Sequence, residues 1–275
     1  MNIFKSRRGD APIISTILLM AVTLLTVSLA LNWVNATLTR RNGEADFESA
    51  KIFMKTIGLQ IDDVAWTQGR VDTVRFSSEF GLLQYVPDAL QYDITYKDST
   101  DGEVGTSTFK SSIFMFNMPT IKYSLSEGYY ELLLPSTEPA LVDSGVSAPV
   151  MKVFARQLYE AGDSDFIRVA AVPMIRMREH TVTVDTSTKS FVSLYIPQLD
   201  GKATASKGMI VLSGKTINPD TFLNVKKITV TVTFPDPNYD SNFFYNFPSG
   251  PQDFILTNDS TVQVFEGVVE LDYPE

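Results

Sequence analysis

An uncharged stretch near the amino end constrains this chain more than any other feature. No Asp, Glu, Lys or Arg occurs from Ala11 to Thr39, and the part from Ile13 to Val34 is strongly apolar. At about 1.5 Å of rise per residue, a helix over these 22 residues is about 33 Å long, which is enough to cross the roughly 30 Å hydrocarbon core of a bilayer. The sequence therefore predicts a membrane-length helix.

Basic residues precede this helix. Lys5, Arg7 and Arg8 lie in a leading segment, residues 1–9, that contains no acid. Positive charge before a membrane helix favours an amino terminus on the cytoplasmic side, although Arg40 and Arg41 on the far side reduce the charge difference. We expect a single-pass protein of the cell membrane whose C-terminal domain lies outside.

An ordinary secretory signal does not fit this amino end. Such a signal has an apolar region of about 7–15 residues that ends at a small-residue cleavage site, whereas this run is longer and has no such site. Two interpretations remain, an uncleaved signal anchor or a short leader that is cut before a retained helix. The junction Arg7-Arg8-Gly9-Asp10, followed by Ala-Pro-Ile-Ile-Ser-Thr-Ile-Leu-Leu-Met, has the layout of the second.

At these residues the sequence resembles the archaeal type IV pilin and archaellin superfamily, whose members carry a class III signal peptide. The resemblance covers about residues 5–35. It implies that a membrane-embedded prepilin peptidase cuts after Gly9 and leaves Asp10 as the new terminus. Bacterial relatives usually carry Glu at the fifth mature position, where this chain has Ile14, as is common in archaeal members. An assembly contact through that Glu is therefore not implied.

The residues after the junction are suited to begin a helix. Asp10 can cap the helix or place an acid near its positive end, and Pro12 is tolerated in the first turn because its missing N–H would be unpaired there. We expect the transmembrane or fibre-core helix to cover residues 10–39. Loss of residues 1–9 removes three positive charges, so the mature chain has 20 basic and 32 acidic residues and a net charge of −12.

A second helical pattern follows the uncharged stretch. Arg40-Arg41-Asn42-Gly43 interrupts the apolar sequence, and Gly43 is a candidate hinge or kink. We expect an amphipathic extension over residues 40–66, whose apolar stripe packs either on the chain's own β domain or on a neighbouring subunit. Residues of the stripe recur every three or four positions and are Phe47, Ala50, Met54, Ile57, Ile61 and Val64.

From Val71 onward the hydrophobic period changes to two, which is typical of β-strands. Many short strands favour an antiparallel, sandwich-like domain over residues 67–275, so the fold class is α+β. The segment 135–149 is a candidate boundary between two lobes. Strands are predicted at residues 71–76, 91–96, 108–116, 129–134, 166–175, 181–184, 190–196, 209–212, 226–234, 253–256 and 262–271.

Composition excludes several classes of function. The chain has no cysteine, which rules out disulfides, thiol catalysis and thiolate metal sites. His180 is its only histidine, so most hydrolase mechanisms lack their usual base, and a lone His in a strand-like run is most often structural. The net charge of −9, with no long basic run, makes nucleic acid a poor partner. We expect a protein that is not an enzyme and needs no cofactor.

One segment resembles the start of a calcium loop. Asp236, Asn238 and Asp240 alternate oxygen ligands, but Ser241 stands where such a loop needs Gly and Phe247 where it needs the closing Glu. A polar turn between strands is the better interpretation, and no metal is expected.

Two other motifs carry limited information. Asn35 and Asn258 begin N-x-Ser/Thr sequons and are candidate glycosylation sites, although about two sequons are expected by chance in this composition. Asp62 and Asp63 form an acidic pair, but adjacent helix positions point in different directions. This favours a helix end that packs Trp66 on the sheet over an acid–base pair.

These features predict a pilin-like surface subunit. The helix would hold it in the lipid bilayer before assembly, and the same apolar surface would bundle with copies of the chain, or with other pilin-like subunits, in an archaeal type IV pilus-like filament. The alternative is a permanently tethered extracellular binding protein or a surface-layer-associated protein. Filaments lost on substitution of Gly9 would support the first, and an intact leader on a monomeric, ligand-binding protein the second.

Overall fold

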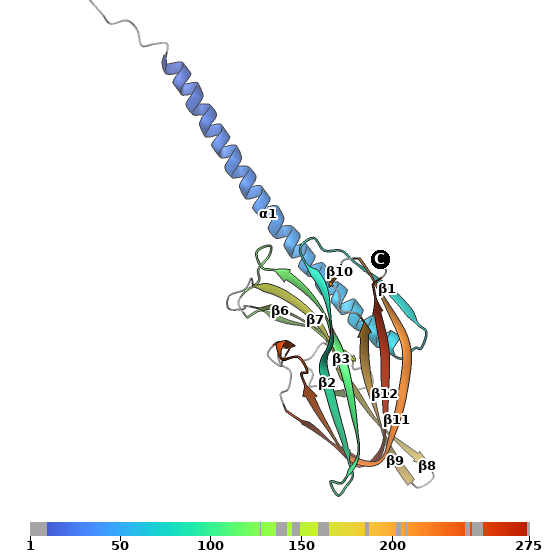
Figure 1. Ribbon diagram of the computed structural model, residues 1–275. Coiled ribbons are helices and arrows are strands. Elements are labelled where there is room, and N and C mark those ends of the chain that lie inside the picture. The colour runs from blue at the N-terminus through green and yellow to red at the C-terminus, as the bar shows by residue number, and fades with distance from the viewer. Residues whose placement is uncertain are drawn as a thin grey trace, which may run out of the picture.

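The protein combines one long amino-terminal helix with a large β-sheet domain (Figure 1), as the α+β prediction requires. The helix, α1, spans Asp10–Ala65 and leaves the domain at one end. The computed structural model describes residues 10–126, 128–135, 142–144, 149–158, 165–184, 187–201, 205–206, 208–239, 243 and 250–273.

Helix α1 is continuous through Arg40-Arg41-Asn42-Gly43, where a hinge or kink was a candidate. Gly43 is buried, and a β-carbon there would lie 2.8 Å from the β-carbon of Tyr123 and 2.9 Å from the carbonyl oxygen of Lys122. The missing side chain of Gly43 therefore allows α1 and the turn at residues 120–123 to lie close together, and the helix is not broken at this point.

The described strands form a single 12-stranded sheet. Its order is β4-β6-β7-β3-β2-β11-β12-β9-β8-β5, while β1 pairs with β11 and β10 with β2. A short 3₁₀ helix, η1 (Pro237–Tyr239), follows β11. The strands are β1 (Val71–Phe76), β2 (Leu82–Lys97), β3 (Glu103–Pro119), β4 (Tyr130–Leu134), β5 (Val142–Ser144), β6 (Met151–Leu158), β7 (Phe166–Pro173), β8 (Ile175–Val184), β9 (Ser187–Gly201), β10 (Ala205–Ser206), β11 (Gly208–Thr233) and β12 (Gln252–Asp272).

The sheet is mixed, not purely antiparallel as expected. Strands β9 and β12 run parallel over residues 190–201 and 260–271, and β5 runs parallel to β8. Parallel neighbours need a long crossover, and here the whole of β11 lies between β9 and β12 in the chain. The parallel pairs are therefore contacts between distant segments, which a local pattern does not reveal.

The candidate lobe boundary at residues 135–149 connects strands of the same sheet. Strand β4 before it pairs with β6 after it, and β5 within it pairs with β8. The described part of the chain thus shows one mixed sheet, and neither a division into two lobes nor a sandwich follows from it.

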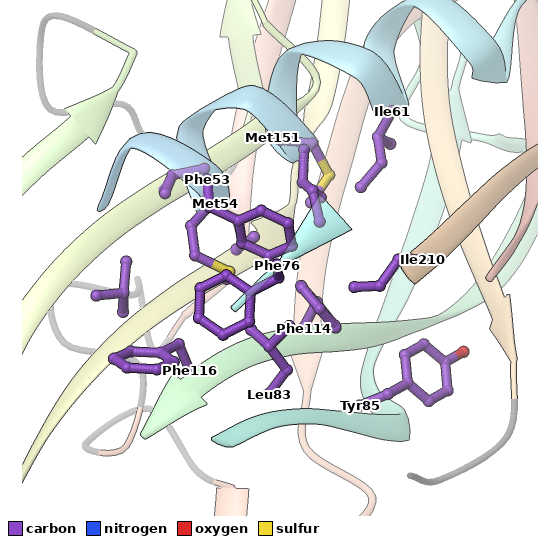
Figure 2. Packing of buried hydrophobic residues seen from close by; sticks show 14 of the residues in the cluster. Phe53, Met54, Ile61, Phe76, Leu83, Tyr85, Phe114, Phe116, Met151 and Ile210 are labelled. Carbon is purple, nitrogen blue, oxygen red and sulfur yellow. The ribbon is translucent and has the colours of Figure 1, made fainter. Parts of the chain in front are cut away.

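The first hydrophobic core lies between α1 and the sheet. Met54, Ile57 and Ile61 of α1 are fully buried, and Figure 2 shows Phe53 and Met54 pointing at aromatic side chains of the sheet. All six residues of the predicted stripe are buried. The carboxyl half of α1 therefore packs on the chain's own domain, which was the first of the two expected roles. Its neighbours in the sheet include Phe76, Leu83, Tyr85, Phe114, Phe116, Met151 and Ile210.

A second core lies on the opposite face of the same strands. In β3, Phe114 and Phe116 belong to the first core and Ile113 and Met115 to the second, because successive side chains of a strand point to opposite faces. The central strands are therefore buried on both faces. The second core is formed mainly from β2, β3, β9, β11 and β12.

Candidate membrane and assembly surface

The amino-terminal half of α1 carries apolar side chains that the described part of the chain leaves exposed. At four consecutive positions, Ile17 to Met20, the exposed fractions lie between 63% and 70%. Consecutive helix positions are about 100° apart, so apolar surface is exposed on every side of the helix. The most apolar stretch of 18 residues has a mean hydropathy of 2.2 and is not buried at all. By length and composition, α1 can cross a membrane.

Three threonine hydroxyls in this half of α1 donate hydrogen bonds to the helix itself. Thr23 Oγ1 donates to the carbonyl oxygen of Leu19, Thr26 Oγ1 donates to that of Thr23 at 2.9 Å, and Thr37 Oγ1 donates to that of Trp33 at 2.8 Å. An apolar environment requires such internal partners, because it offers no water. These threonines are therefore compatible with lipid or with packed helices.

The predicted leader junction lies at the first residue that the structure describes. Asp10, the residue that would become the new terminus, is helical as the first residue of α1. Arg7, Arg8 and Gly9 lie outside the described residues, so their part in cleavage stays a prediction. A cut after Gly9 would leave a chain that is helical from its first residue.

A carboxylate in the middle of α1 fastens the helix to the loop between β1 and β2. Asp46 Oδ2 accepts hydrogen bonds from Ser78 Oγ at 2.8 Å, from the Glu79 amide at 2.8 Å and from the Phe80 amide at 2.9 Å. Charge-assisted bonds to one oxygen are stronger than neutral ones. The point where α1 enters the domain is therefore held by polar contacts as well as by the core.

An ion-pair cluster holds the next turn of α1 to β4. Lys51 Nζ lies 2.8 Å from Glu48 Oε1 and 2.9 Å from Glu131 Oε2, and the Tyr129 hydroxyl also donates to Glu131. Burial alone would raise the pKa of Glu131, but the bonds from Tyr129 and Lys51 and the ammonium charge outweigh it and lower the pKa. Burial alone would lower the pKa of Lys51, and its two carboxylate partners raise it.

The carboxyl end of α1 rests on two glycines of the sheet. A β-carbon at Gly214 would lie 2.5 Å from the Val64 carbonyl oxygen, and one at Gly267 would lie 2.6 Å from that of Ala65. The chain after the helix then pairs with β11, because the Gly69 amide donates to the Gly214 carbonyl at 2.8 Å. Only glycine allows backbone to approach this closely.

The acidic pair near this end has two separate roles. Asp62 Oδ1 accepts from Trp66 Nε1 at 2.9 Å and from Arg176 Nη1 at 3.2 Å, whereas Asp63 pairs with Arg70. The Trp66 ring meets the ring of Tyr195 in β9 edge-on, with centroids 5.2 Å apart. The prediction that Trp66 packs on the sheet is confirmed. Asp62 and Asp63 bind different partners, so they do not form a pair that shares one site.

The other predicted sites lie at the surface. Asn35 is exposed on α1 just after the apolar run, and Asn258 is exposed in β12. Both side chains are accessible for modification in the structure, which does not test whether either carries a glycan. His180 lies in β8, and its ring stacks on that of Phe191 with 5.5 Å between centroids.

The candidate calcium residues form a turn at η1. Asp236 Oδ1 accepts hydrogen bonds from the backbone amide and from Nδ2 of Asn238, both at 2.9 Å, while Asp240 lies outside the described residues. Within the described ranges, no group of three acidic or histidine side chains is placed to hold a metal ion. The interpretation as a polar turn fits the bonds of Asp236.

Sequence reasoning missed a pocket of about 600 Å³ beside η1. Arg168, which is 6% exposed, places its guanidinium 3.9 Å from the ring centroid of Phe243, and its Nε donates to Asn117 Oδ1 at 2.9 Å. Strands β2, β3 and β7 and the segment after β11 build this pocket, so no single stretch of sequence signals it. Its described lining is Phe80, Leu82, Gln84, Met115, Asn117, Met118, Pro119, Phe166, Arg168, Asn238, Tyr239 and Phe243.

Comparisons with known proteins identify no relative of this chain. No family model, curated protein or solved structure matches the chain. The residues and contacts described above are therefore the whole basis for a functional assignment.

Proposed function

We propose that this protein is a non-enzymatic, pilin-like subunit of a surface filament, of the archaeal type IV pilus kind. A prepilin peptidase removes residues 1–9, α1 holds the subunit in the membrane, and the apolar half of α1 then bundles with equivalent helices. The observation that carries the proposal is that one continuous helix is apolar and exposed on every side in its first half, yet fixed to a folded domain in its second half.

The two halves of α1 suit the two stages of such a pathway. In the bilayer, the first half needs length, apolar side chains and internal partners for its hydroxyls; it has the first two, and Thr23, Thr26 and Thr37 have such partners. In a filament, the same surface leaves lipid for other apolar helices, where it stays away from water. The domain stays outside with most of the net charge of the mature chain, −12, which keeps it soluble.

Processing of the native protein tests this proposal. Mass spectrometry of the amino terminus is expected to find a chain that starts at Asp10. A Gly9→Val variant is expected to keep its leader and form no filaments, because a side chain at the cut crowds a peptidase that approaches the backbone closely. Ser6→Val, the same kind of change within the leader, is the control and is expected to be processed. Filaments built from chains that retain residues 1–9 would refute the proposal.

The pocket beside η1 favours one competing function, a tethered binding protein. It offers a buried guanidinium among aromatic side chains, a setting suited to a small ligand with a planar or anionic group. A tethered receptor would work with its leader intact and without assembly. A Gly9→Val variant that stays at the cell surface and still binds a ligand in this pocket would favour this alternative.

A further inference from the structure

A polar cleft lies where α1 leaves the β domain. It has a volume of about 470 Å³ and lies between the helix, from Ala36 to Arg40, and the turn that follows β3. Its lining is Ala36, Thr39, Arg40, Thr120, Ile121, Lys122, Tyr123 and Ser124. The cleft therefore adjoins the exposed apolar half of α1.

The turn that forms one wall of this cleft is firmly placed. Both the amide and the hydroxyl of Thr120 donate to the Asp165 carbonyl, at 3.0 Å and 2.9 Å, and the Lys122 amide donates to that of Pro119 at 3.3 Å. On the other side, the turn contacts the backbone of α1 at Gly43. Helix and turn therefore hold fixed positions relative to one another.

The turn presents one apolar and one cationic side chain to solvent. Ile121 is 86% exposed, the highest exposure among the large apolar side chains described. Lys122 beside it is also exposed, and its Nζ lies 5.3 Å from the centre of the Phe80 ring. An exposed apolar residue next to a cation is the pairing found where proteins meet the membrane interface.

The membrane-side end of the cleft, at Ala36, lies at the height of the headgroup layer. At about 1.5 Å per residue, Ala36 and Arg40 stand about 3 Å and 9 Å beyond Val34, the end of the apolar run. Headgroups extend about 5–8 Å beyond the hydrocarbon on each side, and long basic side chains reach back toward them. Glu44 lies one further turn of α1 away from the membrane. Of the charged residues of α1 at the cleft, Arg40 is therefore nearer the lipid than Glu44.

We propose that this cleft is a second membrane contact, in which Arg40 and Lys122 bind lipid phosphate groups of the outer leaflet and Ile121 inserts among the headgroups. This inference rests on the proposed function in one respect, that α1 spans the bilayer with the domain outside. The contact would seat the domain upright on the membrane before assembly. The lipid partner is inferred from charge complementarity and height.

The absence of cysteine from the chain permits a direct test with single spin labels. Ile121→Cys, Ile255→Cys and Leu24→Cys are each labelled in the full-length protein, which is reconstituted in phosphatidylglycerol vesicles and in phosphatidylcholine vesicles. Ile255 is a matched control, because it is 78% exposed and pairs with Lys227 near the β2–β3 hairpin, at the end of the domain away from α1's exit (Figure 1). Accessibility to lipid-soluble oxygen and to a water-soluble nickel complex gives the depth of each label.

We expect the label at position 121 to be shielded from nickel relative to the label at 255, most strongly in phosphatidylglycerol. Adding Arg40→Gln and Lys122→Gln is expected to raise nickel accessibility at 121 to the level at 255. Lys110→Gln with Lys189→Gln removes two charges from exposed residues elsewhere and is expected to change nothing.

Three outcomes would overturn the inference or its basis. If the label at 121 is as accessible to nickel as the label at 255 in both lipids, while the label at 24 lies in hydrocarbon, the second membrane contact is refuted and membrane insertion of α1 stands. Shielding at 121 that is equal in detergent micelles, or unaffected by the loss of Arg40 and Lys122, would assign this surface to another copy of the chain. A label at 24 exposed to nickel would refute membrane insertion itself.

Discussion

The carbonyl oxygen of Val64 in α1 lies against the backbone of Gly214 in β11, with only 2.5 Å between that oxygen and a β-carbon built at position 214. We therefore expect Gly214→Ala to displace the end of α1 and to lower the free energy of unfolding by about 1–3 kcal/mol, the usual cost of overpacking. Thermal unfolding followed by circular dichroism measures the loss. Gly250→Ala is the control, because a β-carbon there would have no described residue within 4 Å apart from its neighbours in the chain. Equal losses in both variants would contradict this contact between the helix and Gly214.

The buried stripe of α1 can be tested with one pair of isoleucines. Ile57 is fully buried and Ile52, on the same helix, is 68% exposed. We expect Ile57→Ala to lower the free energy of unfolding by about 2–5 kcal/mol and Ile52→Ala to change it by less than about 0.5 kcal/mol. Chemical denaturation of the full chain in detergent gives both values. Similar losses at the two positions would argue that the stripe does not pack on the sheet.

A charge in the apolar half of α1 tests its environment. Leu24→Arg places a cation near the middle of the uncovered segment, at a cost of about 2.5–3.5 kcal/mol on insertion scales. We expect membrane retention and filament incorporation to fall sharply, as measured by fractionation. Leu59→Arg makes the same change on the half of α1 that packs on the domain, at a side chain that is 49% exposed, and is expected to leave both unchanged. If Leu24→Arg also leaves both unchanged, this segment lies in neither lipid nor a filament core.

The ion-pair cluster of Lys51 and Glu131 predicts a dependence of stability on pH. Because the pKa of Glu131 is lowered below its ordinary value of 4.5 in the folded protein, its contribution is complete above that value and is lost as the pH falls through the folded pKa. Both side chains are partly solvated, so we expect at most about 1 kcal/mol. Wild type should exceed Glu131→Gln in stability at pH 7, and the difference should shrink below pH 4.5.

The control for this prediction is Glu103→Gln at an exposed position of β3. It is expected to change stability by less than about 0.5 kcal/mol at neutral pH. A difference between wild type and Glu131→Gln that stays constant from neutral to acid pH would contradict a contribution from the charged carboxylate.

Sequence patterns correctly predicted the features that depend on residues close together in the chain. The spacing of Phe47, Met54, Ile57 and Ile61 marked the face of α1 that is buried, because a helix places such residues on one side. The strand expected at 71–76 has the observed bounds of β1. Neither result needed knowledge of distant segments.

Longer-range features escaped prediction for identifiable reasons. Gly214, Pro219 and Asp220 look like breaks between two short strands, yet β11 runs through all three because β12 pairs with it along this length. The pocket around Arg168 and the parallel pairing of β9 with β12 unite segments far apart in the chain. Gly43 looked like a hinge, since a sequence does not show that the turn at 120–123 presses on that residue.

The unbroken course of α1 from Asp10 to Ala65 ties the direction in which the domain faces to a residue count. A helix turns about 100° and advances about 1.5 Å per residue. One residue inserted between Ala36 and Arg40 would therefore swing the domain by about 100° around the helix axis, and seven would return it to within about 20° of its original direction while lifting it by about 10 Å. The direction in which the domain faces around the helix axis thus depends on the number of residues between Val34 and Gly43 and only weakly on their identity.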